Sequence, residues 1–300
     1  MQHALLPRQV SVLLIAMLAC GFAANHTAAR IAFDDGSGLL LAVLSRSGVT
    51  GLALAAVVAW RRIPVTIDRP ARKWLLLVGL LVTLQSLCIY SAVARIPVGL
   101  ALLLVNLSPV CLALITWFFG GAPPSKRVIY LMMGIFSGLL IVLDLPALLN
   151  QTHRFGDAWL LGVTMSLVAA VVFAVALWII QNRLYHMEGT LRSTITMLLV
   201  FTGASIAGAL GAIPGGLALP QSLTGWTALA CVVFFYGSAI STLFILMPRL
   251  DIARNAPVMN IEPVAGLLMG WLILGQTLDS VQLVGAVIVL GGVVLLAMRA

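Results

Sequence analysis

Long apolar segments separated by short polar breaks dominate the hydrophobicity pattern of this 300-residue chain. A helix needs about 20 mainly apolar residues to cross the hydrocarbon core of a bilayer, which is roughly 30 Å thick. Glycine, proline and charged residues occupy the breaks, as expected of turns. We therefore predict ten transmembrane helices, at residues 9–32, 37–60, 72–95, 97–119, 125–148, 156–181, 190–213, 223–247, 253–274 and 279–298.

The composition excludes a soluble domain. Hydrophobic residues make up 62% of the chain, charged residues make up 9%, and the mean hydropathy is +1.13. Soluble domains contain roughly 45–50% apolar and 25% charged residues. The net charge of +8 comes from short basic clusters between apolar segments, which indicates membrane topology and not nucleic-acid binding. The four cysteines lie inside apolar segments without metal-ligand spacing, so we predict no disulfide framework, metal or cofactor.

The basic residues fall mainly on one side of the predicted membrane. With a cytoplasmic N-terminus, 13 Lys and Arg side chains lie in the cytoplasm and 3 outside, while Arg46 lies within a span. Cytoplasmic loops are enriched in Lys and Arg. We therefore predict a multi-pass protein of the inner membrane with both termini in the cytoplasm. The first span is too long for a signal peptide, whose apolar region has about 7–15 residues.

A motif recurs in the two halves of the chain in one register. A single shift along the sequence places Asn106-x-x-Pro109-Val110 on Asn260-x-x-Pro263-Val264 without a gap. Because five spans per half is an odd number, the second half must cross the membrane upside down relative to the first. Inverted repeats of this kind occur in transporters that hold substrate between the halves. We predict an all-α membrane protein with two inverted five-helix repeats, residues 1–150 and 151–300, around a central cavity.

Prolines interrupt the predicted fourth and ninth spans. Pro109 and Pro263 cannot donate a hydrogen bond to the carbonyl four residues earlier. Backbone groups freed within hydrocarbon must be satisfied by neighbouring helices or by a cavity. Asn106 and Asn260, three residues before each proline, are expected to face that opening. The alternative is that the prolines only kink the helices for packing.

Two charged residues, Arg46 and Glu262, lie well inside predicted spans. An ionisable group at the bilayer centre costs at least about 2.5–3.5 kcal/mol and is a functional candidate by default. One hypothesis is that Glu262 exchanges protons during transport while Arg46 supplies a counter-charge or holds a substrate carboxylate. The alternative is a purely structural ion pair between them.

Further polar and aromatic residues within the spans are candidates for lining the cavity, since pockets for organic ligands combine apolar walls with a few polar groups. Packing, or an aromatic belt at the membrane surface, is the alternative for each of them. These candidates are Asn25, His26, Gln85, Tyr90, Trp178, Gln181 and Tyr236.

At these residues the sequence resembles the EamA branch of the drug/metabolite transporter superfamily. The resemblance implies a basket of ten helices around a central cavity, and export of amino acids, other metabolites or drugs by alternating access. The family often carries Glu after the fourth and ninth spans, where this chain has Gly121-Ala122 and Gly275-Gln276. The stretches that carry the resemblance are Gly21-Phe-Ala-Ala-Asn25, Leu44-Ser-Arg46, the segment from Cys88 to Val110, and the segment from Asn260 to Gly285.

Other classes of function find little support in the sequence. The chain has no HExxH, GxSxG or Walker motif, so we predict neither an enzyme nor an ATP-driven pump. Transport is expected to be secondary active, with protons as a candidate coupling ion, or facilitated. A channel or uniporter, and a receptor or assembly subunit, are the alternatives. The expected partners are a small-molecule substrate and the lipid bilayer, with no nucleic acid, and the protein is expected to be a monomer or homodimer.

Overall fold

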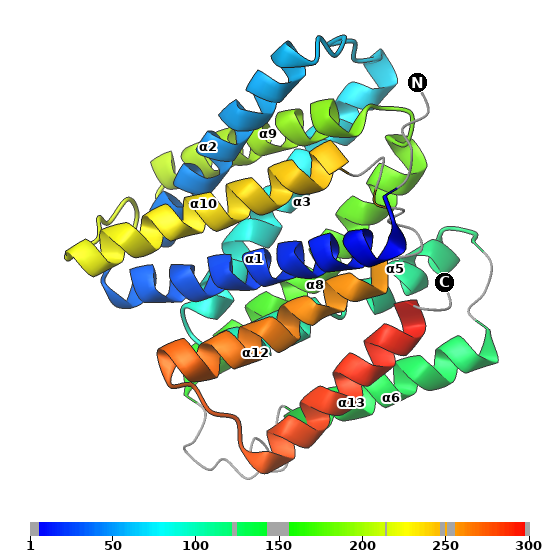
Figure 1. The fold of residues 1–300 in the computed structure, drawn as a ribbon, viewed down its shortest axis with the longest axis vertical. Helices are drawn as coiled ribbons and strands as arrows, with labels where there is room; N and C mark the ends of the chain where they lie inside the picture. Colours follow the sequence, from blue (N-terminus) through cyan, green and yellow to red (C-terminus); the bar gives the residue numbers. More distant parts are fainter. Residues whose placement is uncertain are drawn as a thin grey trace.

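The computed structural model describes residues 6–121, 125–142, 156–213, 215–246, 250 and 256–297. All regular secondary structure in these residues is helical (Figure 1). The helices are α1 (Arg8–Asp34), α2 (Leu39–Trp60), α3 (Arg69–Val93), α4 (Val98–Val105), α5 (Ser108–Phe118), α6 (Lys126–Val142), α8 (Asp157–Arg183), α9 (Gly189–Ala209), α10 (Leu223–Leu246), the 3-10 helix η2 (Ala256–Asn260), α12 (Ile261–Leu274) and α13 (Ser280–Ala297).

Each of the ten predicted spans coincides with a helix or a pair of helices. Helices α4 and α5 together form the fourth span, and η2 with α12 forms the ninth. Seven described segments are long and apolar enough to cross a membrane. Three shorter apolar helices, Val128–Val142, Val258–Leu274 and Ser280–Leu295, complete the set. The predicted all-α fold with ten membrane helices is therefore confirmed.

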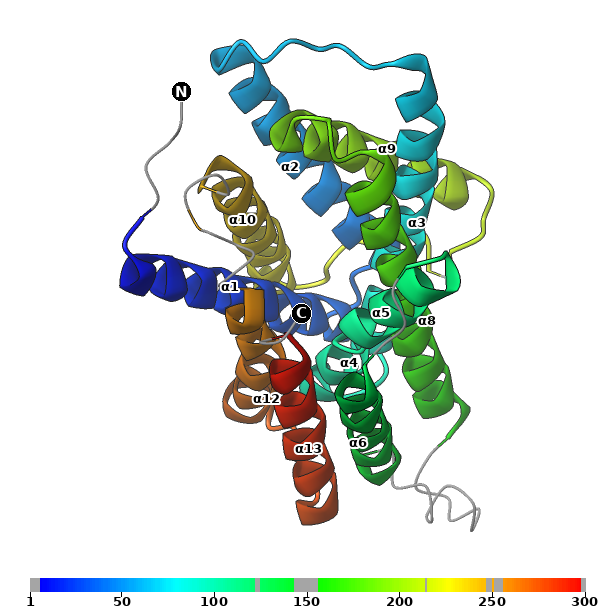
Figure 2. The same cartoon turned by 90° about the vertical axis from the view of Figure 1, so that its right-hand side faces the viewer.

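The two halves pack on each other with a twofold pattern. Helix α1 packs on α10 and α12, while α8, the first helix of the second half, packs on α3 and on α4 with α5. Helix α2 packs on α10, and α9 correspondingly packs on α3. The pairs α2 with α9, α4 with α12, and α6 with α13 are formed between equivalent helices of the two halves. Figures 1 and 2 show α6 lying beside α13 along one side of the bundle.

The register of the repeat changes along each half. Helix α1 begins at Arg8 and its equivalent α8 begins at Asp157, whereas α3 begins at Arg69 and its equivalent α10 begins at Leu223. The number of residues that separates equivalent helices is therefore smaller for the first pair than for the third. The change arises because the linker before α10 is longer than the linker before α3. The register predicted from the asparagine–proline motif thus holds for the last three spans of each half. The predicted boundary at residues 150 and 151 lies outside the described residues.

The two interrupted spans cross each other at glycine residues. A Cβ atom at Gly99 of α4 would collide with Leu267 of α12, and one at Gly266 of α12 would collide with Leu102 of α4. Small residues let membrane helices approach this closely. The backbone N–H of Val98, at the start of α4, donates to Oε1 of Gln276 just beyond α12 at 2.9 Å. The two helices therefore run in opposite directions, and both helix breaks lie on the same side of the crossing.

A carboxylate at the surface joins the two halves. Asp35, directly after α1, accepts hydrogen bonds from the backbone N–H groups of Gln221 and Ser222 at 2.8 and 2.9 Å, and from the Ser222 hydroxyl at 2.5 Å. The Ser222 hydroxyl and then its N–H hold the pKa of Asp35 below its ordinary value. Because Ser222 immediately precedes α10, this contact ties the end of α1 to the start of α10.

Candidate functional site

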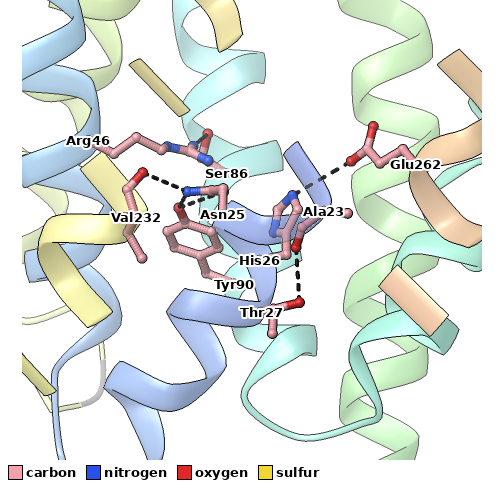
Figure 3. A network of polar contacts seen from close by, with 9 residues as sticks. All are labelled: Ala23, Asn25, His26, Thr27, Arg46, Ser86, Tyr90, Val232 and Glu262. Atoms are coloured by element: carbon pink, nitrogen blue, oxygen red, sulfur yellow. Dashed lines mark hydrogen bonds and ion pairs between the residues drawn. The ribbon is translucent and has the colours of Figure 1, made fainter. Parts of the chain in front are cut away.

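Side chains from five helices meet between the two halves in what we call the polar centre (Figure 3). Helices α1, α2 and α3 of the first half surround it together with α10 and α12 of the second half. Four of its side chains, those of Asn25, Arg46, Ser86 and Tyr90, are almost completely buried. The members of the polar centre are Asn25, His26, Arg46, Ser86, Tyr90, Tyr236 and Glu262.

Arg46 holds a positive charge at the polar centre. Its Nη2 donates to the Ser86 hydroxyl at 2.8 Å, and its guanidinium carbon lies 4.6 Å from the ring centroid of Tyr90 and 4.0 Å from that of Tyr236. Aromatic faces attract cations electrostatically. The Nε atom of Arg46 is buried and has no hydrogen-bond partner. No carboxylate of the described residues forms an ion pair with this guanidinium, so ring faces and neighbouring hydroxyl groups stabilise its charge.

Asn25 connects three helices at the polar centre. Its Nδ2 donates to the Val232 carbonyl at 2.9 Å and to the Tyr90 hydroxyl at 3.2 Å. The Tyr90 hydroxyl is also 3.3 Å from Oδ1 of Asn25 and can donate to it. A buried polar group needs such partners because an unsatisfied one costs about 1–3 kcal/mol. Asn25 therefore fixes α1 against α3 and α10, and it holds the Tyr90 ring beside Arg46.

Glu262 lies next to His26 and not next to Arg46. The Nε2 of His26 is 4.0 Å from Oε1 of Glu262, at the limit of an ion pair, and the Nδ1 of His26 is buried without a partner. The structural pair of Arg46 with Glu262, one of the two predicted alternatives, is therefore not formed. Glu262 belongs to the first turn of α12, where the helix dipole favours a negative charge.

The proline motifs interrupt their helices as predicted. Helix α4 ends at Val105, and the Ser108 hydroxyl donates to the carbonyl of Val105, which Pro109 leaves without its helical donor. This carbonyl is therefore satisfied within its own turn. The Nδ2 atoms of Asn106 and Asn260 are both buried and unpartnered, so each helix break presents a free donor to the interior. Pro263 is buried in the first turn of α12.

Three of the predicted lining residues lie away from the polar centre. Trp178 stacks on Phe119, with ring centroids 4.6 Å apart, and packs against an apolar cluster on α3 and α8. Gln181 is exposed near the end of α8, and Gln85 is partly buried without a contact to the polar centre among those the structure describes. Helix α8 occupies the place related to α1 by the twofold pattern, so its side chains meet α3 and not α10.

Sequence reasoning missed two contributors to the polar centre. Ser86 lies four residues before Tyr90 on α3, so both side chains project from one helix face. That spacing was a usable signal. The Val232 carbonyl carried no signal, because every residue has a carbonyl and only the packing of α1 on α10 selects this one.

The interface equivalent to that of α1 with α10 has a different character. Where α3 packs on α8, the buried side chains are those of Leu75, Val78, Ile179 and Leu184. We call this set the apolar counterpart. The four side chains of this set are aliphatic, and the rings of Trp74 and Trp178 pack against them. A charge adjoins the set where the guanidinium of Arg183 lies over the Trp74 ring.

The fold and the buried charges define an inverted-repeat membrane protein with buried polar groups between its halves. The sequence profile of the EamA-like transporter family matches residues 9–144 and 160–298. Because the match covers nearly the whole chain, this protein belongs to the EamA-like transporter family. It is accordingly a multi-pass membrane transporter of small solutes, and the predicted resemblance is confirmed.

The fold resembles that of a solved crystal structure. It superimposes with a TM-score of 0.59 at 18% sequence identity, over 98% of this chain and 100% of the other. Identity this low shows likeness of fold alone. The polar centre of this chain must therefore be interpreted from its own residues.

Proposed function

We propose that this transporter exports small amphipathic solutes, such as amino acids or amphipathic drugs, across the inner membrane by alternating access. In this proposal the solute binds at the polar centre. The observation that carries the proposal is the buried guanidinium of Arg46, which lies between two tyrosine rings and has no carboxylate partner among the described residues.

The free donor of Arg46 favours a solute with a carboxylate or similar anionic group. Arg46 Nε is buried and unpartnered, and the side-chain amides of Asn106 and Asn260 are further buried, unpartnered donors at the two helix breaks. A planar guanidinium suits bidentate binding of a carboxylate. Leaving a buried donor unpartnered is costly, and a bound anion would satisfy Arg46 Nε.

The rings and nearby walls favour an apolar body on the same solute. Tyr90 and Tyr236 flank the guanidinium, and a groove of about 690 Å³ between α2 and α10 begins one turn from Arg46, at Thr50. Its other lining residues include Val49, Leu229 and Val233. Ligand sites of this kind combine apolar walls with a few polar groups. Polyphosphates would require several buried cations, whereas Arg46 is the charged cation of the polar centre.

Proton coupling through Glu262 remains part of the proposal. His26 belongs to the first half of the chain and Glu262 to the second, and their contact spans the interface. Protonation of Glu262 would remove its attraction for His26, and this would allow α1 and α12 to separate during the cycle. Facilitated transport, in which Glu262 keeps one protonation state, is the alternative.

A counterflow experiment tests the proposal. Purified protein is first screened by thermal shift against amino acids, polyamines and cationic drugs, and the stabilising solute is then used in proteoliposomes. We expect saturable counterflow that falls by at least about 100-fold in Arg46→Met, because two or more charge-assisted hydrogen bonds are lost. Arg95→Met is the matched control, since Arg95 lies in the turn after α3 and bonds to Ser91, four residues earlier.

Two outcomes would overturn the proposal. An ohmic current without saturation would indicate a channel. Wild-type counterflow in Arg46→Met would remove the polar centre from the transport path.

A further inference from the structure

A polar cavity adjoins the linker between α2 and α3. Figure 2 shows this linker at one end of the bundle. The cavity has a volume of about 620 Å³ and is lined by the linker between α2 and α3 and by the segment between α8 and α9. We propose that this cavity binds the phosphate of an anionic phospholipid headgroup through Arg61, Arg62 and Arg183. This site is independent of the solute that the transporter carries.

The cavity has an excess of positive charge. Arg61, Arg62 and Arg183 line it, and the ion pairs found within the described ranges lie elsewhere. Glu188 also lines it, but its carboxylate accepts from the Thr190 hydroxyl at 2.9 Å and from the Leu191 N–H at 2.7 Å.

Asp68 is the other carboxylate of the cavity, and His186 also belongs to its lining. The three arginines of the lining are thus accompanied by two carboxylates. The carboxylate of Glu188 is already hydrogen-bonded at the start of its own helix, and no hydrogen bond is described for that of Asp68. Arginine is suited to phosphate because its planar donors bind two oxygen atoms at once. The charge balance therefore favours an anion over a cation.

Exposed aromatic residues beside the cavity indicate that it lies at headgroup depth. Trp60 is 80% exposed beside Arg61, and Tyr185 is 62% exposed between Leu184 and His186. Tryptophan and tyrosine concentrate at the membrane interface. The guanidinium carbon of Arg183 also lies 5.2 Å from the ring centroid of Trp74. At this depth a lipid headgroup can reach the arginines while its acyl chains stay in the bilayer. A soluble anion would not need a site at headgroup depth, so the position of the cavity favours a lipid.

The backbone at Arg62 supports a binding role for its side chain. Arg62 has a φ of 51° in the turn after α2, where glycine is the usual residue because other side chains are strained. Strained backbone of this kind tends to occur at functional positions. A glycine at this position would make the same turn without strain, but it would supply no guanidinium.

Lipid competition in nanodiscs tests the proposal. Full-length protein is reconstituted in phosphatidylcholine with increasing fractions of phosphatidylglycerol, and retained lipid is measured by native mass spectrometry. The test variant is Arg61→Gln, Arg62→Gln, Arg183→Gln. The matched control is Arg69→Gln, Arg72→Gln, Lys73→Gln, which removes the same charge from the start of α3 without changing the cavity lining.

We expect the preference of wild-type protein for phosphatidylglycerol to fall at least about tenfold more in the test variant than in the control. Each basic residue near a membrane surface contributes about fivefold in affinity, and the cavity adds direct contacts. Equal loss in both variants would show a diffuse surface charge and overturn the proposal. Equal stabilisation of protein in phosphatidylcholine by glycerol phosphate would identify a soluble phosphate ester instead, and would also overturn it.

A single substitution keeps the test informative if the triple variant does not fold. Arg62→Gly relieves the strained backbone and removes one guanidinium. We expect it to unfold at a higher temperature in phosphatidylcholine and to lose about fivefold of the phosphatidylglycerol preference. An unchanged preference in this variant would contradict the role of Arg62.

Discussion

The two interfaces related by the internal repeat differ sharply in chemistry. At the polar centre, where α1 meets α10, Asn25 donates to Tyr90 and to the Val232 carbonyl. At the apolar counterpart, where α8 meets α3, Leu75 and Ile179 are buried among other aliphatic side chains. The backbone arrangement is shared, but the polar groups are not. The repeat therefore supplies the scaffold, and the departures from the repeat indicate the functional site.

The two helix breaks show the same difference on a smaller scale. The first break has Ser108 directly before Pro109, and its hydroxyl satisfies the carbonyl of Val105. The second break has Glu262 directly before Pro263, and its carboxylate reaches His26 on α1. The side chain before the first proline therefore bonds to the backbone of its own helix, whereas the side chain before the second proline contacts the opposite half of the protein.

The largest expected effect is a difference in how substitutions at the two interfaces change stability and transport. Leu75→Ala in the apolar counterpart should lower the free energy of unfolding by at least about 2 kcal/mol, because it leaves a cavity, and transport per folded molecule should change less than twofold. Arg46→Met should unfold at a higher temperature than wild type, since an apolar side chain replaces a buried unpaired charge. Thermal unfolding and counterflow measure both. The comparison fails if Leu75→Ala loses transport while remaining folded.

The pH dependence of transport gives the next largest effect. If Glu262 exchanges protons, wild-type transport should vary by up to about tenfold per pH unit in its titration range. Glu262→Gln cannot change its charge and should give a flat profile. Initial rates in proteoliposomes across a pH series measure this. Transport by Glu262→Gln at the wild-type rate over the whole series would exclude proton coupling through Glu262.

Loss of Asn25 should have a smaller effect on stability. Asn25→Ala removes hydrogen bonds to Tyr90 and Val232, and we expect a loss of about 1 kcal/mol in unfolding free energy. Asn182→Ala is the control, because Asn182 is exposed and bonds only to Trp178 in the described contacts. Denaturant unfolding in detergent compares the two. Equal losses of unfolding free energy in the two variants would show that the hydrogen bonds of Asn25 stabilise the fold no more than that of an exposed asparagine.

The smallest effect is expected at Asp35, at the surface end of the contact between α1 and α10. Its hydrogen bonds from Ser222 lower the pKa of the carboxyl. A lowered pKa in the folded state means that this stabilisation is present above the ordinary aspartate pKa of about 3.9 and is lost as the pH falls through the lowered value. Asp35→Asn should therefore flatten the loss of thermal stability below about pH 4. A steeper loss in Asp35→Asn would contradict this assignment.

Much of the fold could be predicted because hydrocarbon restricts what a chain can do. Backbone polar groups must be satisfied within the membrane, so apolar segments of sufficient length become helices. The helix breaks at Pro109 and Pro263 followed from the missing proline N–H. The contact of His26 with Glu262 could not be predicted in this way. It depends on which faces of α1 and α12 meet, and neither helix has a polar stripe that specifies this.

Two of the candidate lining residues lie outside the polar centre for a related physical reason. Trp178 and Gln181 are polar or aromatic residues inside an apolar span, as His26 is. The sequence does not show that α8 packs on α3 while α1 packs on α10. It also does not show that the repeat offset is smaller for the first helices than for the later ones. Only the assembled bundle separates residues of the polar centre from those of its apolar equivalent.

A structure of the protein bound to the solute found by the thermal-shift screen would test the central claim most directly. We predict solute density against the Arg46 guanidinium, between the rings of Tyr90 and Tyr236, with its anionic group facing Arg46 Nε. Density at the apolar counterpart on α3 and α8, with the polar centre empty, would contradict this assignment of the transport site.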